Sequence, residues 1–293
     1  MDLNWLKVFR LKEILPGAAP FFLAVLDTNV WPNWWQFLIL VGGFYLLFIS
    51  SFLINEYVDS FDTDKFNAER GKAITKHAVS RKFTLAAFFT ASFFSTLLLF
   101  LLGQLWVALI GLTLLTLYSA KPVRLKARPF LDLAAVTIGF VLLPFLSYNL
   151  LVGQNITGIT ALTLAFFSLG FVAIDLVAEG ADFWADKRAS LKTTAVLLGE
   201  YKNLLAIQFL SLTSAFLGIL TIILTGHWWY FYVVAAVFFL FTAAQFGLTI
   251  YKDKDRLHEL LRTGERFGVF ISDIGTGILF LIWLVTATKN WLL

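Results

Sequence analysis

The sequence predicts an all-α integral membrane protein with about nine transmembrane helices. Three observations lead to this prediction: the composition, a series of long apolar runs, and basic residues gathered on one side of the membrane. Of the 293 residues, 59% are hydrophobic and 14% are charged, and the mean hydropathy is +0.80. These values lie outside the range of soluble globular domains.

Nine runs are long enough for membrane helices, since the bilayer core requires roughly 20 apolar residues. They cover residues 14–31, 35–57, 83–103, 105–120, 131–152, 157–178, 203–225, 227–250 and 267–288. The runs are too uniformly apolar for the alternating strands of an outer-membrane barrel. Each is therefore expected to form a helix.

The basic residues predict the orientation of these helices. With nine spans, the N-terminal arm and the connections after the second, fourth, sixth and eighth spans share one face of the membrane. All 23 Lys and Arg residues except Lys289 fall on that face. By the positive-inside rule this face is cytoplasmic, so the N-terminus is expected inside the cell and the C-terminus outside.

The connections between the runs leave no room for a soluble domain. The longest polar stretch covers about 25 residues between Val58 and Lys82, well below the size of an independent domain. We therefore expect one domain, residues 1–293. The absence of cysteine excludes disulfides, thiolate metal sites and cysteine nucleophiles. The net charge of +4 reflects the membrane topology, and no nucleic-acid-binding module is recognisable.

Acidic residues gather at the predicted cytoplasmic ends of the second and sixth spans. Acidic residues contribute little to topology, so these two groups require another explanation. On a continuing helix each group forms one stripe with spacings of three and four residues. The first stripe contains Asn55, Asp59 and Asp62, and the second contains Asp175, Glu179, Asp182 and Asp186.

Such stripes are typical of a site for a hard divalent cation. Like charges four residues apart destabilise a helix, so a stripe with few local cations favours an external partner. Carboxylate and carboxamide oxygens suit Mg²⁺, which proteins often bind together with substrate phosphates. For either stripe alone, a solvated helix end in a charged loop is an equally good interpretation.

The two stripes together favour the metal interpretation. The second and sixth spans run in the same direction, and Asp59 and Asp182 lie 123 residues apart. This spacing is typical of a duplicated half, which places two metal-binding helix ends across a central cavity. A transporter would keep its ionisable groups near the middle of the membrane, where these helices carry almost no charge.

Basic residues between the stripes supply the partners that a diphosphate needs, because Lys and Arg neutralise phosphate oxygens directly. The candidates follow the first stripe, the fourth span and the second stripe; they are Arg70, Lys72, Lys121, Arg124, Lys126 and Lys192. Many basic residues on this face are topology signals, so the candidates within motifs rank highest.

The chain resembles the UbiA superfamily of membrane prenyltransferases over essentially its whole length. The family's NxxxDxxxD motif is matched by Asn55 and Asp59. Its second motif, DxxxD followed by Lys-Thr, is similar to DFWADKRASLKTTAVLLG, which contains Asp182, Asp186 and Lys192. The Tyr and basic pattern between the two motifs is similar to YSAKPVRLK, which begins at Tyr118.

Two positions depart from the family pattern. The third position of the first motif is Thr63, and we expect Asp62 to replace the missing carboxylate, because at i+7 from Asn55 it stays on the stripe while Asp64 is rotated away. The family's Lys four residues after the Tyr is here Pro122, which leaves Lys121, Arg124 and Lys126 as candidates.

The resemblance implies nine helices around a central cavity and Mg²⁺-dependent transfer of a prenyl chain from a polyprenyl diphosphate to an acceptor. The implied catalytic residues are Asn55, Asp59, Tyr118, Asp182 and Asp186, and the implied metal ligands are Asp59, Asp62, Asp182 and Asp186. Aromatic side chains, among them 32 Phe residues, would line the path of an allylic cation.

The acceptor is not defined by these motifs. An aromatic quinone precursor of the hydroxybenzoate or dihydroxynaphthoate type is the first interpretation. A geranylgeranylglyceryl phosphate prenyltransferase of archaeal lipid synthesis is the alternative, since AEGAD before the second motif is similar to EGD in that branch. A polytopic transporter or a non-catalytic lipid- or quinone-binding protein is the alternative from another class. We expect a multi-pass protein of the cell membrane whose active site faces the cytoplasm and whose surroundings are membrane lipids.

Overall fold

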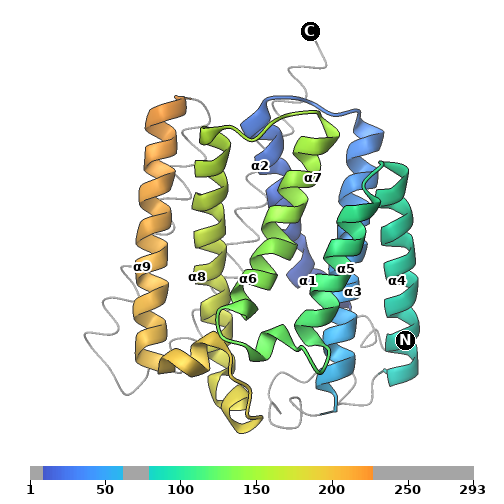
Figure 1. Ribbon diagram of the computed structural model, residues 1–293, viewed down its shortest axis with the longest axis vertical. Helices are drawn as coiled ribbons and strands as arrows, with labels where there is room; N and C mark the ends of the chain where they lie inside the picture. Colours follow the sequence, from blue (N-terminus) through green and yellow to red (C-terminus); the bar gives the residue numbers. More distant parts are fainter. Residues whose placement is uncertain (1–8, 62–78, 227–293) are drawn as a thin grey trace.

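The computed structural model describes residues 9–61 and 79–226, and every regular element in these two ranges is helical (Figure 1). The elements are α1 (Leu11–Ile14), η2 (Leu15–Ala18), α2 (Ala19–Thr28), α3 (Trp34–Asp59), α4 (Arg81–Leu101), α5 (Leu105–Ser119), η4 (Leu125–Ala127), α6 (Leu131–Thr137), η5 (Ile138–Leu142), α7 (Leu143–Leu151), α8 (Gly158–Arg188) and α9 (Thr194–Thr225). Elements α6, η5 and α7 follow one another directly and form one rod, in which η5 is a π-helical turn.

Seven of the nine predicted spans lie in the described ranges, and each corresponds to a helix or a helical rod. Five of these are long and apolar enough to cross a membrane, and α2 and α5 are shorter apolar helices. The predicted spans 227–250 and 267–288 lie outside the described residues. The observed helices thus confirm the all-α prediction for the part of the chain that the structure describes.

Three of the predicted boundaries are wrong, each for a local reason. The first run is not one helix, because η2, which contains Pro16 and Gly17, separates α1 from α2. Helix α8 continues ten residues beyond the predicted end at residue 178 and reaches Arg188. Helix α9 begins at Thr194, nine residues early, and bends at Gly199, whose φ of 76° is accessible to glycine.

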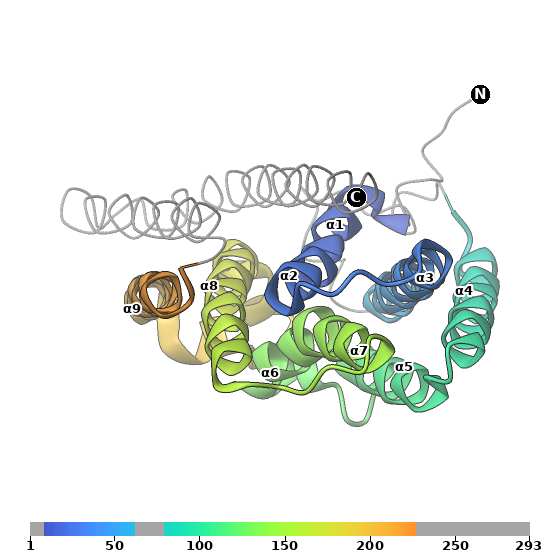
Figure 2. The same ribbon diagram turned by 90° about the horizontal axis from the view of Figure 1, so that it is seen from above.

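The long helices run side by side (Figure 1). Seen from above, α8 lies between α9 and the rod of α6 and α7, and α3 packs on α4 at the other side (Figure 2). Helices α3 and α8 run in the same direction, as the duplicated pattern predicts (Figure 1). The end of α3 at Asp59 and the end of α8 at Arg188 therefore lie at the same end of the bundle.

Small residues allow these helices to approach closely, as is common in membrane proteins. The Ser95 hydroxyl of α4 donates to the carbonyl of Gly43 in α3 at 2.7 Å. A Cβ atom on Gly111 of α5 would lie 2.6 Å from a methyl group of Leu47 in α3. These contacts fix α3, which carries the first acidic stripe, against two neighbouring helices.

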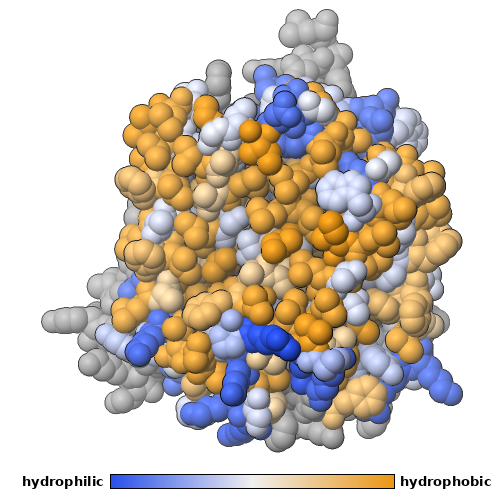
Figure 3. All heavy atoms as spheres, viewed as in Figure 1, coloured by the Kyte–Doolittle hydropathy of each residue, from blue (hydrophilic) through white to orange (hydrophobic). Residues whose placement is uncertain are grey.

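The face of the bundle seen in Figure 3 is apolar along its middle and hydrophilic at its ends. Large apolar side chains point outward from several helices, including Phe93 of α4 and Phe209 of α9, which are 63% and 69% exposed. An apolar band between two polar ends is the surface expected of a protein surrounded by lipid.

Candidate active site

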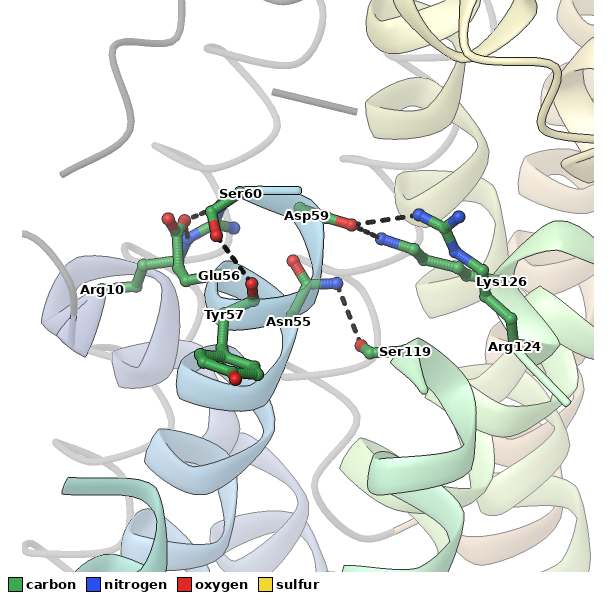
Figure 4. Close-up of polar contacts among 9 residues, drawn as sticks. All are labelled: Arg10, Asn55, Glu56, Tyr57, Asp59, Ser60, Ser119, Arg124 and Lys126. Atoms are coloured by element: carbon green, nitrogen blue, oxygen red, sulfur yellow. Dashed lines mark hydrogen bonds and ion pairs between the residues drawn. The ribbon is translucent and has the colours of Figure 1, made fainter. Parts of the chain in front are cut away.

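The first motif lies at the end of α3, where Asn55 and Asp59 are one helical turn apart. The Asn55 carboxamide donates to the hydroxyl of Ser119 at 3.1 Å (Figure 4). Ser119 is the last residue of α5. The first acidic stripe is therefore joined directly to the segment that begins with Tyr118.

Asp59 is buried and forms ion pairs with two of the predicted diphosphate-binding residues (Figure 4). Lys126 Nζ contacts Asp59 Oδ1, and Arg124 Nη2 lies 3.4 Å from the same oxygen. The side chains of both basic residues are 9% exposed, and that of Asp59 is 5% exposed. The structure thus brings together one predicted metal ligand and two predicted phosphate ligands.

The backbone after α5 explains how both cations reach Asp59. Arg124 adopts a left-handed conformation with φ of 42° and precedes the short helix η4. Its amide donates to the carbonyl of Ala120 at 2.7 Å, which closes the turn, and the amide of Ala127 donates back to its carbonyl at 2.9 Å. Lys121 is exposed on this turn, whereas Arg124 and Lys126 are buried.

Glu56, the residue after Asn55, belongs to a separate buried ion pair that the sequence reasoning missed. It is 2% exposed, and Oε1 accepts from Arg10 Nε at 3.1 Å and Nη2 at 2.7 Å (Figure 4). The Arg10 guanidinium also lies over the Phe52 ring, 5.4 Å from its centroid. The segment before α1 is thereby fixed to the functional end of α3.

The second motif lies on the last turns of α8, where Asp182 and Asp186 are both half-buried. A tight turn follows, in which the amide of Leu191 donates to the carbonyl of Asp186 at 2.9 Å. Lys192 is exposed directly after this turn. Glu179 of the same stripe has a different partner, since its Oε2 accepts from the amide of Ala195 at 3.1 Å.

Tyr118 lies on the second-stripe side of α5. Its phenol is close enough to the carboxylates of Asp175, Glu179 and Asp186 on α8 to interact with them electrostatically. The neighbouring Ser119 bonds to Asn55 of the first stripe. The end of α5 therefore lies between the two acidic stripes.

Asp132, in the first turn of α6, is a buried carboxylate in the same region. It accepts hydrogen bonds from the amide and the hydroxyl of Thr194, both at 2.5 Å. Sequence reasoning missed it because it stands alone in an apolar run and belongs to neither stripe. The signal that could have found Asp132 is this isolation, because an ionisable residue within a membrane span is rare and marks a functional position.

Within the described residues, the first stripe contains Asn55 and Asp59. Helix α3 ends at Asp59, and the backbone amide of Ser60 caps it by donating a hydrogen bond to the carbonyl of Glu56 at 3.1 Å. Helix α3, which places Asn55 and Asp59 on one face, thus ends before Asp62. Asp62 and Asp64 lie outside the described residues, as do Arg70 and Lys72.

The donor set fits Mg²⁺ in its chemistry. Asn55, Asp59, Asp182 and Asp186 offer the hard oxygen ligands that this ion prefers, and they lie at one end of the bundle. In residues 9–61 and 79–226 no three acidic or histidine side chains form a ready-made metal site. The basic side chains of Arg124 and Lys126 next to Asp59 are the kind that bind phosphate oxygens.

These features define a class: a multi-pass helical membrane protein with an acidic and basic site at one end of its bundle. The sequence matches the model of the UbiA prenyltransferase family over residues 15–272. The chain belongs to this family, and it is therefore an enzyme of the prenyltransferase class.

Solved structures share this fold. A UbiA homologue from Archaeoglobus fulgidus has a TM-score of 0.73 at 16% identity, covering 97% of this chain and 99% of that one. The structure of an Archaeoglobus fulgidus homologue bound to GPP and Mg²⁺ has a TM-score of 0.71 at 17% identity, with coverages of 94% and 99%. A digeranylgeranylglyceryl phosphate synthase has a TM-score of 0.61 at 14% identity, with coverages of 93% and 97%. A comparison with curated protein sequences finds no significant match.

Proposed function

We propose that this protein transfers a prenyl chain from a polyprenyl diphosphate to an aromatic quinone precursor, with Mg²⁺ as its cofactor. The observation that carries the proposal is the end of α5, which places Ser119 on Asn55 and Tyr118 beside the acids of α8. Asn55 of the first stripe and the acids of the second stripe thus lie on either side of the end of α5. The relative with GPP and Mg²⁺ bound has the same fold, which supports the prenyl diphosphate and the Mg²⁺ of this proposal.

We assign the acidic residues of the site to the metal and the basic residues to the diphosphate. The metal ligands are Asp59, Asp62, Asp182 and Asp186, with Asn55 beside them, and bound Mg²⁺ would neutralise charge on the departing diphosphate. The phosphate ligands are Arg70, Lys72, Lys121, Arg124, Lys126 and Lys192. Because Lys126 and Arg124 already contact Asp59, we infer that both cations turn from this carboxylate to the diphosphate when substrate binds.

The prenyl chain is proposed to lie among the helices, beyond the acidic ends. Phe48 of α3 stacks on Phe140 of η5 with ring centroids 4.5 Å apart, and Phe140 stacks in turn on Phe171 of α8 at 6.4 Å. Each CH₂ group that leaves water contributes about 0.8 kcal/mol, which favours an apolar path for a long chain. Electron-rich rings also stabilise an allylic cation by roughly 0.5 to 2 kcal/mol each. Tyr118 is the ring we propose nearest the reacting carbon.

We further propose a single domain of nine membrane helices around a central cavity, with the N-terminus and the active site on the cytoplasmic side. The basic residues support this orientation, because every Lys and Arg except Lys289 falls on one predicted face. Fusion of a reporter to each terminus in turn tests it. A cytoplasmic signal from the C-terminal fusion would contradict the odd number of spans.

Turnover of the purified protein in detergent tests the proposed reaction. Geranyl and geranylgeranyl diphosphate are supplied with 4-hydroxybenzoate, 1,4-dihydroxy-2-naphthoate or geranylgeranylglyceryl phosphate, each with Mg²⁺ or with EDTA. Mg²⁺-dependent product with an aromatic acceptor is the expected result. Product with the glyceryl phosphate alone would assign the second candidate, to which the similar digeranylgeranylglyceryl phosphate synthase points. No prenyl transfer to any of the three acceptors would contradict the proposed function.

A pair of variants tests whether Asp62 or Asp64 supplies the third carboxylate of the first motif. Asp62→Asn is expected to reduce Mg²⁺-dependent turnover by orders of magnitude, and Asp64→Asn is the matched control. If the control is inactive and Asp62→Asn remains active, the third carboxylate of the motif is Asp64.

A further inference from the structure

The start of α9 is held by side chains from α6 and α8 and by its own N-cap residue, Thr193. The amide of Thr194 donates to Asp132 Oδ2 of α6 at 2.5 Å, and the amide of Ala195 donates to Glu179 Oε2 of α8 at 3.1 Å. The amide of Val196 donates to the hydroxyl of Thr193 at 3.3 Å. The first turn of a helix leaves these amides without backbone partners, so side chains must satisfy them where they are buried.

The contact between Asp132 and Thr194 is the most extensive of the three. The Thr194 hydroxyl donates to Asp132 Oδ1 at 2.5 Å and accepts from the amide of Phe130 at 2.6 Å. Asp132 is 0% exposed and Thr194 is 1% exposed. Leaving a buried donor or acceptor unpaired is destabilising, so each of these hydrogen bonds is needed where it lies.

The location of this contact connects the two halves of the active site. Asp132 follows Lys126 by six residues, and its amide donates to the carbonyl of Arg128 at 3.1 Å, so the basic segment and α6 are continuous. Thr194 follows Lys192 by two residues and comes directly after the turn that begins at Asp186. One side-chain contact therefore joins the segment that pairs with Asp59 to the end of the second motif.

We propose that Asp132 is a positioning residue for prenyl diphosphate binding. Its hydrogen bonds hold Thr194 in place. They thereby fix the position of Lys192 and the end of α8 relative to Arg124 and Lys126. It acts through these residues and does not itself touch the substrate. This inference rests on the proposed function, and it adds to the site a residue from outside both motifs.

The test compares two nearly isosteric variants, Asp132→Asn and Thr194→Val, with Thr194→Ser as the control. Asp132→Asn replaces one acceptor oxygen with an NH₂ group, which then faces a donor of Thr194. Thr194→Val removes the hydroxyl and retains the volume, whereas Thr194→Ser retains the hydroxyl. A small displacement of a positioning group lowers productive binding by about ten- to a hundredfold. We expect KM for geranylgeranyl diphosphate to rise at least about tenfold in Asp132→Asn and Thr194→Val, with Thr194→Ser restoring it to within about threefold.

A double-mutant cycle shows whether Asp132 acts through Lys192. The effect of Asp132→Asn on KM should shrink in a Lys192→Met background, because the group that it positions is then absent. In a Lys202→Met background the effect should be unchanged, since Lys202 is exposed on α9 away from the turn. Equal effects in both backgrounds would overturn the proposal, as would an unchanged KM in variants that lose thermal stability alone.

A second measurement does not depend on turnover. The chain contains no cysteine, so spin labels on Arg128→Cys and Arg188→Cys report the distance between the basic segment and the end of α8. The distribution of this distance should broaden in Thr194→Val and remain narrow in Thr194→Ser. A distribution that Thr194→Val leaves unchanged would refute the positioning role even if the prenyltransferase assay succeeds. Absence of turnover in the wild type, with the predicted broadening, would instead count against the proposed function alone.

Discussion

Removal of the Asp59 carboxylate should affect both stability and catalysis, by amounts that follow from its two partners. Arg124 Nη2 lies 3.4 Å from Asp59 Oδ1, and Lys126 contacts the same oxygen. At 3.4 Å the screened attraction between two unit charges is about 5 kcal/mol for an effective dielectric constant of about 20. The cost of burying both charges offsets most of this attraction in the folded protein.

Asp59→Asn removes the carboxylate from two adjacent buried cations. The free energy of unfolding is therefore expected to fall by more than a surface salt bridge contributes. Breaking a buried pair by removing one partner typically costs about 3–5 kcal/mol. Lys126→Met should cost less, about 1–3 kcal/mol, because Asp59 then retains Arg124. The expected order of stability is wild type, then Lys126→Met, then Asp59→Asn, measured by SDS unfolding in mixed micelles.

Turnover separates the structural role from the catalytic one. Both variants should lose at least about a hundredfold in Mg²⁺-dependent prenyl transfer, because charge stabilisation of the leaving group is lost in each. Lys202→Met, which removes an exposed cation from α9, is the control for the loss of positive charge. If Asp59→Asn is as stable as the wild type and transfers prenyl groups at a normal rate, the reasoning about this buried pair is wrong.

Three further predictions concern other parts of the molecule. Asp182→Asn should reduce Mg²⁺-dependent turnover by orders of magnitude with little change in melting temperature, because Asp182 is half-buried at a helix end with no core to lose. Arg10→Met should destabilise the protein by about 3 kcal/mol, because it leaves Glu56 buried and without its cation, and the double variant Arg10→Met/Glu56→Gln should recover most of this loss in SDS unfolding. Gly17→Ala should cost about 1–3 kcal/mol, because the added Cβ would lie 2.6 Å from the Phe48 ring.

Each of these predictions has an outcome that contradicts it. Near-normal Mg²⁺-dependent activity of Asp182→Asn would exclude this carboxylate as a metal ligand. Additive losses in Arg10→Met and Glu56→Gln would show that the two side chains do not depend on each other. Gly158→Ala is the control for Gly17→Ala, since nothing lies within 4 Å of the added Cβ there; equal losses in the two variants would refute the packing argument.

The sequence alone determined the class of the fold and predicted the composition of the site. Apolar runs of bilayer length specify helices because lipid offers no partner for the backbone, and this reason is local to each run. The spacing of four residues between Asn55 and Asp59, and between Asp182 and Asp186, likewise specifies a shared helix face. The family motifs then indicated prenyl transfer.

Tertiary structure decided which of these residues meet. Lys126 is separated from Asp59 by 67 residues, and Ser119 from Asn55 by 64, so no periodicity in the sequence relates them. Packing of the segment after α5 brings two of the predicted phosphate ligands, Arg124 and Lys126, to Asp59. The sequence also left Asp132 as a lone acid in an apolar run, whereas the fold turned it toward Thr194, 62 residues away. The physical reason is that a buried charge acquires its role from the donors packed around it, and those donors come from helices that are distant in the chain.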